Sequence, residues 1–292
     1  MKTGNVYPMY FLSGVLLIYS GLFFFPSLYG FYLSLTDWNQ FSDAVHFIGL
    51  DNYRQMIADH ALFSGIIVNT IMFALFTTLL KNVIGLALAL ALNEGLRSKA
   101  LLRTVFYLPV TLSPLIIGLI FSSVFDANSG ILNGFLIRIG LDDWAMAWLA
   151  DVRFAMGTII SVETWKYAGF NMVIYLAGLQ MIPKTYYEAA EIDGASSWKR
   201  FVHITFPLVM PAITINLILN LIHGFKIFDL VYVLTGGGPG SATEVLNTAV
   251  FREFSAGRFG SATAINVVIF LLITVVTLAT LSILSKRSEV EA

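Results

Sequence analysis

Two sets of polar and aromatic residues stand inside otherwise apolar stretches of the chain. One set is Glu163, Tyr167, Phe170, Asn171 and Ile174, and the other is Asn216, Asn220, His223 and Ile227. Spacings of three and four residues place the members of each set on one face of a helix. Aromatic rings stack on the apolar faces of sugars, while amides and carboxylates hydrogen-bond to hydroxyl groups. The two faces are therefore suited to bind a polyhydroxylated solute.

Polar side chains within apolar spans have a second interpretation. Asn and His hydrogen-bond across neighbouring membrane helices, so the same residues are also suited to hold a bundle together. Charged residues in such spans are costly and indicate a functional interior or a buried pair. Glu163 is expected to be neutralised by Lys166 or Lys226, and Lys81 either lines a water path or pairs with an acid. The residues alone leave both interpretations open.

The composition indicates a chain whose solvent is largely lipid. Of the 292 residues, 57% are hydrophobic and 12% are charged, and the mean hydropathy is +0.79. A soluble domain is roughly 25% charged. The net charge of -1 excludes a polybasic nucleic-acid binder and an acidic disordered chain. The sequence has no Cys, which excludes disulfides, thiolate metal sites and a Cys nucleophile.

Motifs for cofactors and for nucleophilic catalysis are missing from the sequence. No Gly-x-x-x-x-Gly-Lys-Ser/Thr run is present, so we expect no phosphate-binding loop. The four histidines (His46, His60, His203 and His223) lack the spacing of metal ligands. No Ser-His-Asp set can be argued from the sequence. We therefore expect no metal, no cofactor and no catalytic residue on this chain.

Six stretches are long and apolar enough to cross a membrane, since about 20 helical residues span the hydrocarbon core. They cover about residues 9–35, 64–92, 104–125, 156–182, 205–234 and 261–284. The sequence thus predicts an all-α integral membrane protein with six transmembrane helices and no separate soluble domain. Pro109 and Pro114 predict kinks in the third span.

The distribution of Lys and Arg predicts the orientation. With the N-terminus in the cytoplasm, the nine positive charges on the inner side are Lys2, Arg97, Lys99, Arg103, Lys184, Lys199, Arg200, Lys286 and Arg287. The five on the outer side are Arg54, Arg138, Arg153, Arg252 and Arg258. The excess of positive charge in the short inner segments places both termini in the cytoplasm.

The inner segment 183–211 predicts two short helices around a glycine. Glu188-Ala189-Ala190-Glu191 has high helix propensity, and Gly194 is suited to end that helix in a left-handed conformation. Ser196 or Ser197 can cap a second short helix, and Pro207 suits the first turn of the next span. The expected product is a compact helical projection on the cytoplasmic face. A plain connecting loop is the alternative.

This segment and three others carry a family pattern. Glu188-Ala189-Ala190, Asp193-Gly194-Ala195, Ile204 and Pro207 resemble the EAA loop of ABC import permeases. The preceding residues 176–183, the run 235–239 with Thr243, and the run 47–53 followed by Asn69-Thr70 resemble other segments of carbohydrate importers. The four matches occur in family order between residue 47 and about residue 260. The chain resembles a membrane subunit of a binding-protein-dependent sugar importer of the maltose or glycerol-phosphate permease family.

The resemblance implies a fold, a mechanism and partners. It implies the transmembrane-domain fold of type I ABC importers over residues 1–292, with a coupling loop at 183–206. The residues that would contact a cytoplasmic ATPase are Glu188, Ala189, Ala190, Asp193, Gly194 and Ala195. A second permease subunit, two ATPases that bind ATP and Mg, and an extracytoplasmic solute-binding protein would complete the transporter. The sugar would cross the cell membrane by alternating access driven by ATP.

The resemblance also implies where a sugar would bind. The family's sugar-contact positions fall near Glu163, Lys166, Tyr167, Phe170, Asn220, Gly224 and Ile227, and His223 lies on the same polar face. Two other function classes remain open. An integral-membrane enzyme could use Glu163, His223 and Asp229 as acid–base groups, although no catalytic spacing supports it. An ion-coupled carrier predicts inverted repeats, and the sequence has no such symmetry.

Overall fold

The computed structural model describes residues 10–42, 44–58, 60–93 and 98–288. These residues are helical apart from loops and a single isolated bridge between Thr36 and Phe47, which confirms the all-α prediction. The predicted first span begins at residue 9, just outside the described residues, and both chain ends, with Lys2, also lie outside them. Arg97 lies outside them too. The chain divides into two compact units.

The first unit consists of Met1–Phe63 and Ala249–Phe270. Its first long helix runs through α1 (Tyr10–Tyr19), a π-helical turn and α2 (Phe25–Leu33). The unit also holds α3 (Asp51–Ala58), most of α14 (Leu246–Ser255) and the first part of α15 (Phe259–Ser288). Asn52 of α3 donates hydrogen bonds to the carbonyls of Ser34 and Thr36 at 2.8 and 2.9 Å, which ties α3 to the end of α2.

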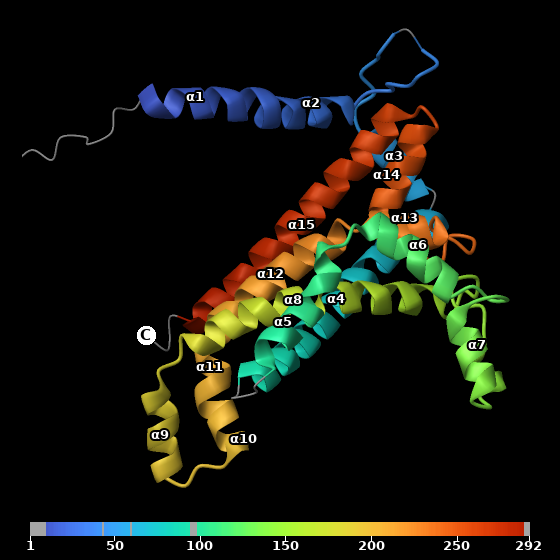
Figure 1. The fold of residues 1–292 in the computed structure, drawn as a ribbon. Helices are drawn as coiled ribbons and strands as arrows, with labels where there is room; N and C mark the ends of the chain where they lie inside the picture. The colour runs from blue at the N-terminus through green and yellow to red at the C-terminus, as the bar shows by residue number, and fades with distance from the viewer. Residues whose placement is uncertain (1–9, 43, 59, 94–97, 289–292) are drawn as a thin grey trace, which may run out of the picture. The chain divides into compact units, whose positions relative to one another are not determined.

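The second unit consists of Ser64–Thr248 and Leu271–Ala292. Its helices are α4 (His60–Asn93), α5 (Lys99–Thr111), α6 (Pro114–Val124), α7 (Ile131–Arg138), α8 (Ala155–Gln180), α9 (Lys184–Ile192), α10 (Ser197–Arg200), α11 (Phe206–Leu208), α12 (Met210–Phe225) and α13 (Asp229–Thr235). Figure 1 shows α9 and α10 projecting beyond the C-terminal end of α8, while α7 lies beyond its N-terminal end. The helix α8 connects these two ends of the unit.

The core of the second unit forms around α8, which packs against α5, α12 and α13. Close approach depends on small residues. A Cβ at Gly169 would lie 1.9 Å from the carbonyl oxygen of Phe106 in α5, and one at Gly85 would lie 2.6 Å from the Cβ of Asn171. One apolar cluster holds Phe73, Ile117, Ile159 and Leu230, and the cluster nearer the C-terminal end of α8 is built around Met172, Tyr175, Leu176 and Ala212.

The predicted number of six spans is not confirmed. Among the described residues, three helices are long and apolar enough to cross a membrane: Leu12–Leu33, Phe63–Asn93 and Phe259–Ile283. Two bent helix pairs, counted as one span each, raise the number to five. The predicted fourth span corresponds to α8, which has the length but carries Glu163, Lys166 and Asn171 in its middle. These polar residues reduce its mean hydropathy.

Two predicted spans are interrupted in the structure. The span 104–125 bends by 96° between α5 and α6. Ser113 precedes Pro114 and is extended (φ −58°, ψ 136°), because proline disfavours a helical conformation at the residue before it. The predicted span 205–234 is bent by 64° near Val209 and its helix ends at Phe225. A new helix, α13, begins at Asp229, whose carboxylate suits a helix N-terminus.

Candidate functional site

A buried ion pair joins α4 to α8 in the middle of the second unit. Lys81 Nζ donates a hydrogen bond to Glu163 Oε1 at 2.7 Å, and the two residues are 0% and 1% exposed. A buried carboxylate or ammonium is strongly disfavoured unless it is paired. The structure therefore identifies Lys81 as the residue that neutralises Glu163. The sequence-based partners for Glu163 were Lys166 and Lys226, and neither is the residue that pairs with it.

His223 and Tyr167 surround this pair. The Nδ1 atom of His223 in α12 lies 3.2 Å from the same oxygen of Glu163, without the alignment that a hydrogen bond requires. The ring of Tyr167 stacks at a tilt on His223 with 4.5 Å between centroids. Lys81 Nζ lies 4.6 Å from the centroid of the Tyr167 ring, within the range of a cation–π contact. Residues from α4, α8 and α12 thus meet at one polar cluster.

Lys166 binds backbone carbonyls and, contrary to the sequence-based prediction, is not the residue that neutralises Glu163. Its Nζ donates hydrogen bonds to the carbonyl oxygens of Leu112 at 2.7 Å and Val110 at 3.3 Å. These carbonyls are left over at the C-terminal end of α5, where the chain breaks before α6. A cation near unpaired carbonyls at a helix C-terminus is stabilising. Lys166 therefore holds the bend between α5 and α6.

Three asparagines connect α8 and α12 about two turns of α8 from the ion pair. Asn220 Nδ2 donates to Asn171 Oδ1 at 2.5 Å and to the carbonyl of Asn216 at 2.8 Å. Asn216 Nδ2 donates to the carbonyl of Asn171 at 3.3 Å. All three residues are buried. The amides that were predicted to face a solute therefore bond to one another in this conformation.

Of the remaining residues of the predicted solute path, some pack inside the protein and others are partly exposed. Gly224 lies against α4, where a Cβ would be 2.7 Å from the Cα of Ala74. Ile227 follows the end of α12 and is buried in the apolar cluster with Phe73 and Leu230, so it does not share the helix face of Asn220. Tyr167, Phe170 and His223 are half-buried. Of the residues predicted for the solute path, these three are the accessible ones in this conformation.

The loop after α8 forms the helix–glycine–helix arrangement that the sequence predicts. Gly194 has φ +73°, and the amides of Ala195 and Gly194 donate to the carbonyls of Ala190 and Glu191, as in a Schellman cap. The side chain of Ser196 accepts a hydrogen bond from the Lys199 amide at the start of α10. Gly194 and Ser196 thus confirm the predicted turn and cap.

Two polar contacts join the α9 side of this loop to the α10 side. The hydroxyl groups of Tyr187 and Thr205 lie 3.0 Å apart, and Arg200 lies 4.0 Å from Glu191. Glu188, Ala189, Asp193 and Gly194 are exposed, and Ala190 and Ala195 are half-buried. The large side chains of Ile192 and Trp198 are 87% and 71% exposed. An apolar and acidic surface on a rigid turn is suited to bind another protein.

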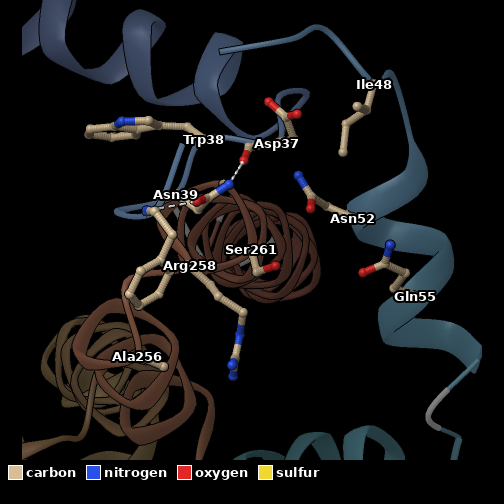
Figure 2. A pocket seen from close by; sticks show the side chains of 11 residues that line it. Asp37, Trp38, Asn39, Ile48, Asn52, Gln55, Ala256, Arg258 and Ser261 are labelled. Carbon is tan, nitrogen blue, oxygen red and sulfur yellow. Dashed lines mark hydrogen bonds between the residues drawn. The ribbon is translucent and has the colours of Figure 1, made fainter. Parts of the chain in front are cut away.

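The first unit contains a pocket of about 370 Å³, drawn in Figure 2. Its polar side chains are largely engaged in holding the surrounding loops. Asn39 donates to the carbonyl of Asp37 and accepts from the amide of Phe41, both at 2.8 Å, and Arg258 forms two hydrogen bonds with Glu253. None of the residues predicted for coupling or for solute binding lines this pocket.

Comparison with known proteins decides the family. Residues 81–290 match the family model described as "Binding-protein-dependent transport system inner membrane component". The matched region holds well over half of the chain and contains the α9–α10 loop and the polar cluster. The chain belongs to this family. It is therefore the membrane-embedded permease component of an ABC importer.

Individual relatives cover nearly the whole permease. It is 34% identical to the probable ABC transporter permease protein YurN of Bacillus subtilis, over 93% of this chain and 94% of that protein. It is 36% identical to the probable starch degradation products transport system permease protein AmyD of Thermoanaerobacterium thermosulfurigenes, over 91% of this chain and 89% of that protein. A crystal structure of a bacterial ABC transporter involved in the import of the acidic polysaccharide alginate matches with a TM-score of 0.82 and 25% identity, over 95% of this chain and 96% of that chain.

The structure of the permease also gives partners to Lys81 and Asn82, whose roles the sequence left open. Asn82, next to Lys81, accepts a hydrogen bond from the hydroxyl group of Tyr175 at 2.5 Å. Lys81 and Asn82 are therefore neighbours that both connect α4 to α8. A lysine in the middle of an apolar span signals that an acid must lie nearby. Glu163, an acid within another predicted span, was the available partner for Lys81.

Proposed function

We propose that this permease is one of two membrane subunits of a transporter that imports a sugar or oligosaccharide. One relative is named for the transport of starch degradation products, and the matched crystal structure is that of a transporter involved in the import of alginate. Both names describe carbohydrates. The family description adds that transport depends on a binding protein. We infer that a solute-binding protein delivers the sugar to the outer face of this permease.

The observation that carries the proposal is the exposed α9–α10 loop. Its turn is rigid because Gly194 and Ser196 fix both helix ends, yet Glu188, Ile192 and Trp198 stay exposed in the part of the chain that the structure describes. The sequence has no phosphate-binding loop of its own. We propose that Glu188, Ala189, Ala190, Asp193, Gly194 and Ala195 dock on a cytoplasmic ATPase, which binds ATP and Mg on its own chain.

We propose that the solute path passes the polar cluster. Tyr167, Phe170 and His223 supply two aromatic rings and an imidazole that are accessible in this conformation. Glu163, Lys166 and Asn220 lie behind them, and Gly224 and Ile227 set the spacing of α4 and α12. Alternating access would separate helices here, since conformational states differ in which packed surfaces meet. Asn220 and Glu163 would then exchange partners within the cluster for hydroxyl groups of the sugar.

The orientation belongs to the same proposal. The chain is a multi-pass membrane protein, and we propose that it lies in the cell membrane with both termini in the cytoplasm. The excess of Lys and Arg in the inner segments supports this orientation. It places α9 and α10 on the side of the membrane where ATP is available.

Affinity purification from native membranes tests the proposal. A tagged permease in a gentle detergent is expected to retain a second six-span protein and a phosphate-binding-loop ATPase, both detected by mass spectrometry. Vesicles that contain this complex and the neighbouring solute-binding protein should take up one labelled sugar from a panel, in an ATP-dependent manner. A permease that purifies alone, while a control importer stays intact in the same detergent, would contradict the proposal.

A further inference from the structure

The short helix α7 presents an apolar stripe that nothing in the described part of the chain covers. Ile131, Phe135 and Ile139 recur every four residues and are 73%, 56% and 52% exposed. Spacing of four residues places them on one face. Leu132, Asn133 and Leu136 face the rest of the unit instead, because they are buried or half-buried. Arg138 is also exposed and lies beside the stripe at the end of α7, because it follows Ile131 by seven residues and Phe135 by three.

A compact turn fixes α7 close to the end of α6. Asp126 Oδ1 accepts hydrogen bonds from the amides of Asn128 and Ser129 and from the hydroxyl group of Ser129. These bonds hold the pKa of Asp126 below its usual range, and the bond from the Ser129 amide has the largest effect. A Cβ at Gly130 would lie 2.2 Å from the carbonyl oxygen of Asp126, so only glycine permits this turn. The helix α7 cannot swing away from α6.

Asn133 fixes the rotation of α7 about its own axis. Its Nδ2 donates to the carbonyls of Ala127 at 3.0 Å and Met146 at 2.9 Å, and its Oδ1 accepts from Trp148 Nε1 at 2.8 Å. Asn133 is 4% exposed, so these bonds are shielded from water. With the buried face held in this way, the stripe of Ile131, Phe135 and Ile139 keeps one direction.

The helix α6, which precedes α7, also exposes an apolar surface. This helix is half of a bent membrane span and packs against α7. Its exposed side chains are Leu115, Ile116, Leu119 and Ile120. The segment after α7 supplies the polar boundary that an interfacial helix needs. Arg138, Asp142 and Asp143 are exposed there, beside Trp144, which is 62% exposed. Trp and Arg are favoured where hydrocarbon meets the lipid headgroups.

We propose that α7 lies in the headgroup region of the bilayer, with Ile131, Phe135 and Ile139 inserted among the acyl chains and Arg138 at the phosphates. The occupant of this surface is phospholipid, not a protein. The helix would thereby hold the connection between α6 and α8 at the membrane surface. Because Lys166 fixes the bend between α5 and α6, and Asn133 fixes α7, the broken span would be anchored at both of its parts.

Fluorescence quenching tests this placement. Because the sequence has no Cys, a thiol-reactive label attaches only at an introduced Cys. Phe135→Cys and Ile139→Cys carry a thiol-reactive fluorophore on the stripe, and Asp142→Cys is the control in the exposed polar segment that follows α7. The wild-type chain, which has no Cys, supplies the labelling blank for the complex with its partner subunits. Each labelled complex is reconstituted in phosphatidylcholine vesicles that contain either a 5-doxyl lipid or none, and iodide is the aqueous quencher.

We expect doxyl lipid to quench the labels at 135 and 139 at least twofold more than the label at 142, and iodide to show the opposite order. Equal access of iodide to 135 and 142 would overturn the proposal, because the stripe would then face water. Protection of 135 and 139 from both quenchers would also overturn it, because a protein would then cover the stripe. The second stripe position keeps the test valid should one variant fail to assemble.

Discussion

The charged residues of the cluster around Glu163 are buried, whereas the acidic residues of the α9–α10 loop are exposed. In the cluster, Lys81 and Glu163 are buried and pair with each other, and Asn220 is buried and bonds to Asn171. In the loop, Glu188 and Asp193 are exposed, and the turn is fixed by the backbone amides of Gly194 and Ala195 and by the side chain of Ser196. The cluster pairs its charges within one chain, whereas the loop leaves its acidic side chains exposed.

This difference predicts how substitutions in each region will act. Changes in the cluster act on stability, because each polar group leaves a buried partner unpaired when it is removed. Changes in the loop are expected to act on the proposed coupling, because its exposed side chains contribute little to folding of this chain. Substitutions that separate stability from transport therefore test the comparison.

The largest effect is expected from Lys81→Met. Removal of the ammonium leaves Glu163 buried and unpaired, and breaking a buried ion pair costs about 3–5 kcal/mol. The melting temperature of the purified complex and its amount in the membrane should both fall sharply. The double variant K81M/E163Q is the control, since it removes both charges and should regain most of the stability. A Lys81→Met permease as stable as the wild type would show that the pair is not the stabilising element of this cluster.

The next largest effect is expected from Gly194→Leu. A residue with a Cβ in the left-handed region is strained by about 1–3 kcal/mol, although nothing lies within 4 Å of the Cβ position. The turn should open, and ATP-dependent uptake should be lost while membrane insertion and the melting temperature stay near wild type. Gly194→Asn is the matched control, because asparagine tolerates this conformation. Unaffected uptake by Gly194→Leu would remove the loop from the coupling mechanism.

A smaller effect is expected from Glu188→Ala. Glu188 is exposed in this chain, so its loss should leave folding unchanged. A contact with the ATPase worth ~1.4 kcal/mol would reduce the affinity of the two chains about tenfold. Retention of the ATPase at low protein concentration measures this change. Glu253→Ala is a control that removes an acid from the other unit. Equal retention by all three proteins would argue against a contact at Glu188.

Asn220→Ala sharpens the assignment of the cluster. The variant leaves Asn171 Oδ1 without its donor, and interhelical hydrogen bonds in membranes are worth about 0.6 kcal/mol on average. The melting temperature should fall slightly, and the apparent KM for the transported sugar should rise if Asn220 also meets the sugar. Asn216→Ala, which leaves the bond between Asn171 and Asn220 side chains intact, separates the two roles. A shift in melting temperature without any change in uptake would limit Asn220 to packing.

The smallest effect is expected at a surface pair that belongs to neither region. The side chain of Arg153 holds the pKa of Asp151 at about 2, below its ordinary value of 3.8. Because the pKa is lowered on folding, the stabilisation is complete above about pH 4 and disappears as the pH falls toward 2. Both side chains are solvent-accessible, so Arg153→Ala should change the melting temperature barely at all, and the difference from wild type should vanish on acidification. A large shift at neutral pH would contradict this ranking.

Local signals predicted the α9–α10 loop well. Gly194 and Ser196 act through the conformation of single residues, so a short stretch of sequence contains the whole cause of the turn. The start of α8 at Ala155 and its end at Gln180 also lie close to the predicted 156–182, since the apolar run has clear limits. The break at Ser113 was foreseen as a kink because Pro114 restricts the residue before it.

Partners across helices could not be predicted from spacing. The pairs Lys81–Glu163 and Asn82–Tyr175 join residues 82 and 93 positions apart, and only the packing of α4 on α8 decides them. The end of α12 at Phe225 was also missed, because residues 226–228 remain apolar enough to continue a span. As a result Ile227 was placed on the face of Asn220, whereas the structure buries it in the apolar cluster.

Site-specific photo-cross-linking from the α9–α10 loop tests the central claim most directly. A photoreactive residue at position 192, where Ile192 is 87% exposed, is compared with one at position 144, where Trp144 is 62% exposed, in native membranes with an active transporter. We predict that position 192 forms an adduct with a phosphate-binding-loop ATPase and that position 144 does not. An active transporter in which position 192 yields no ATPase adduct, or in which both positions yield the same one, would contradict the account.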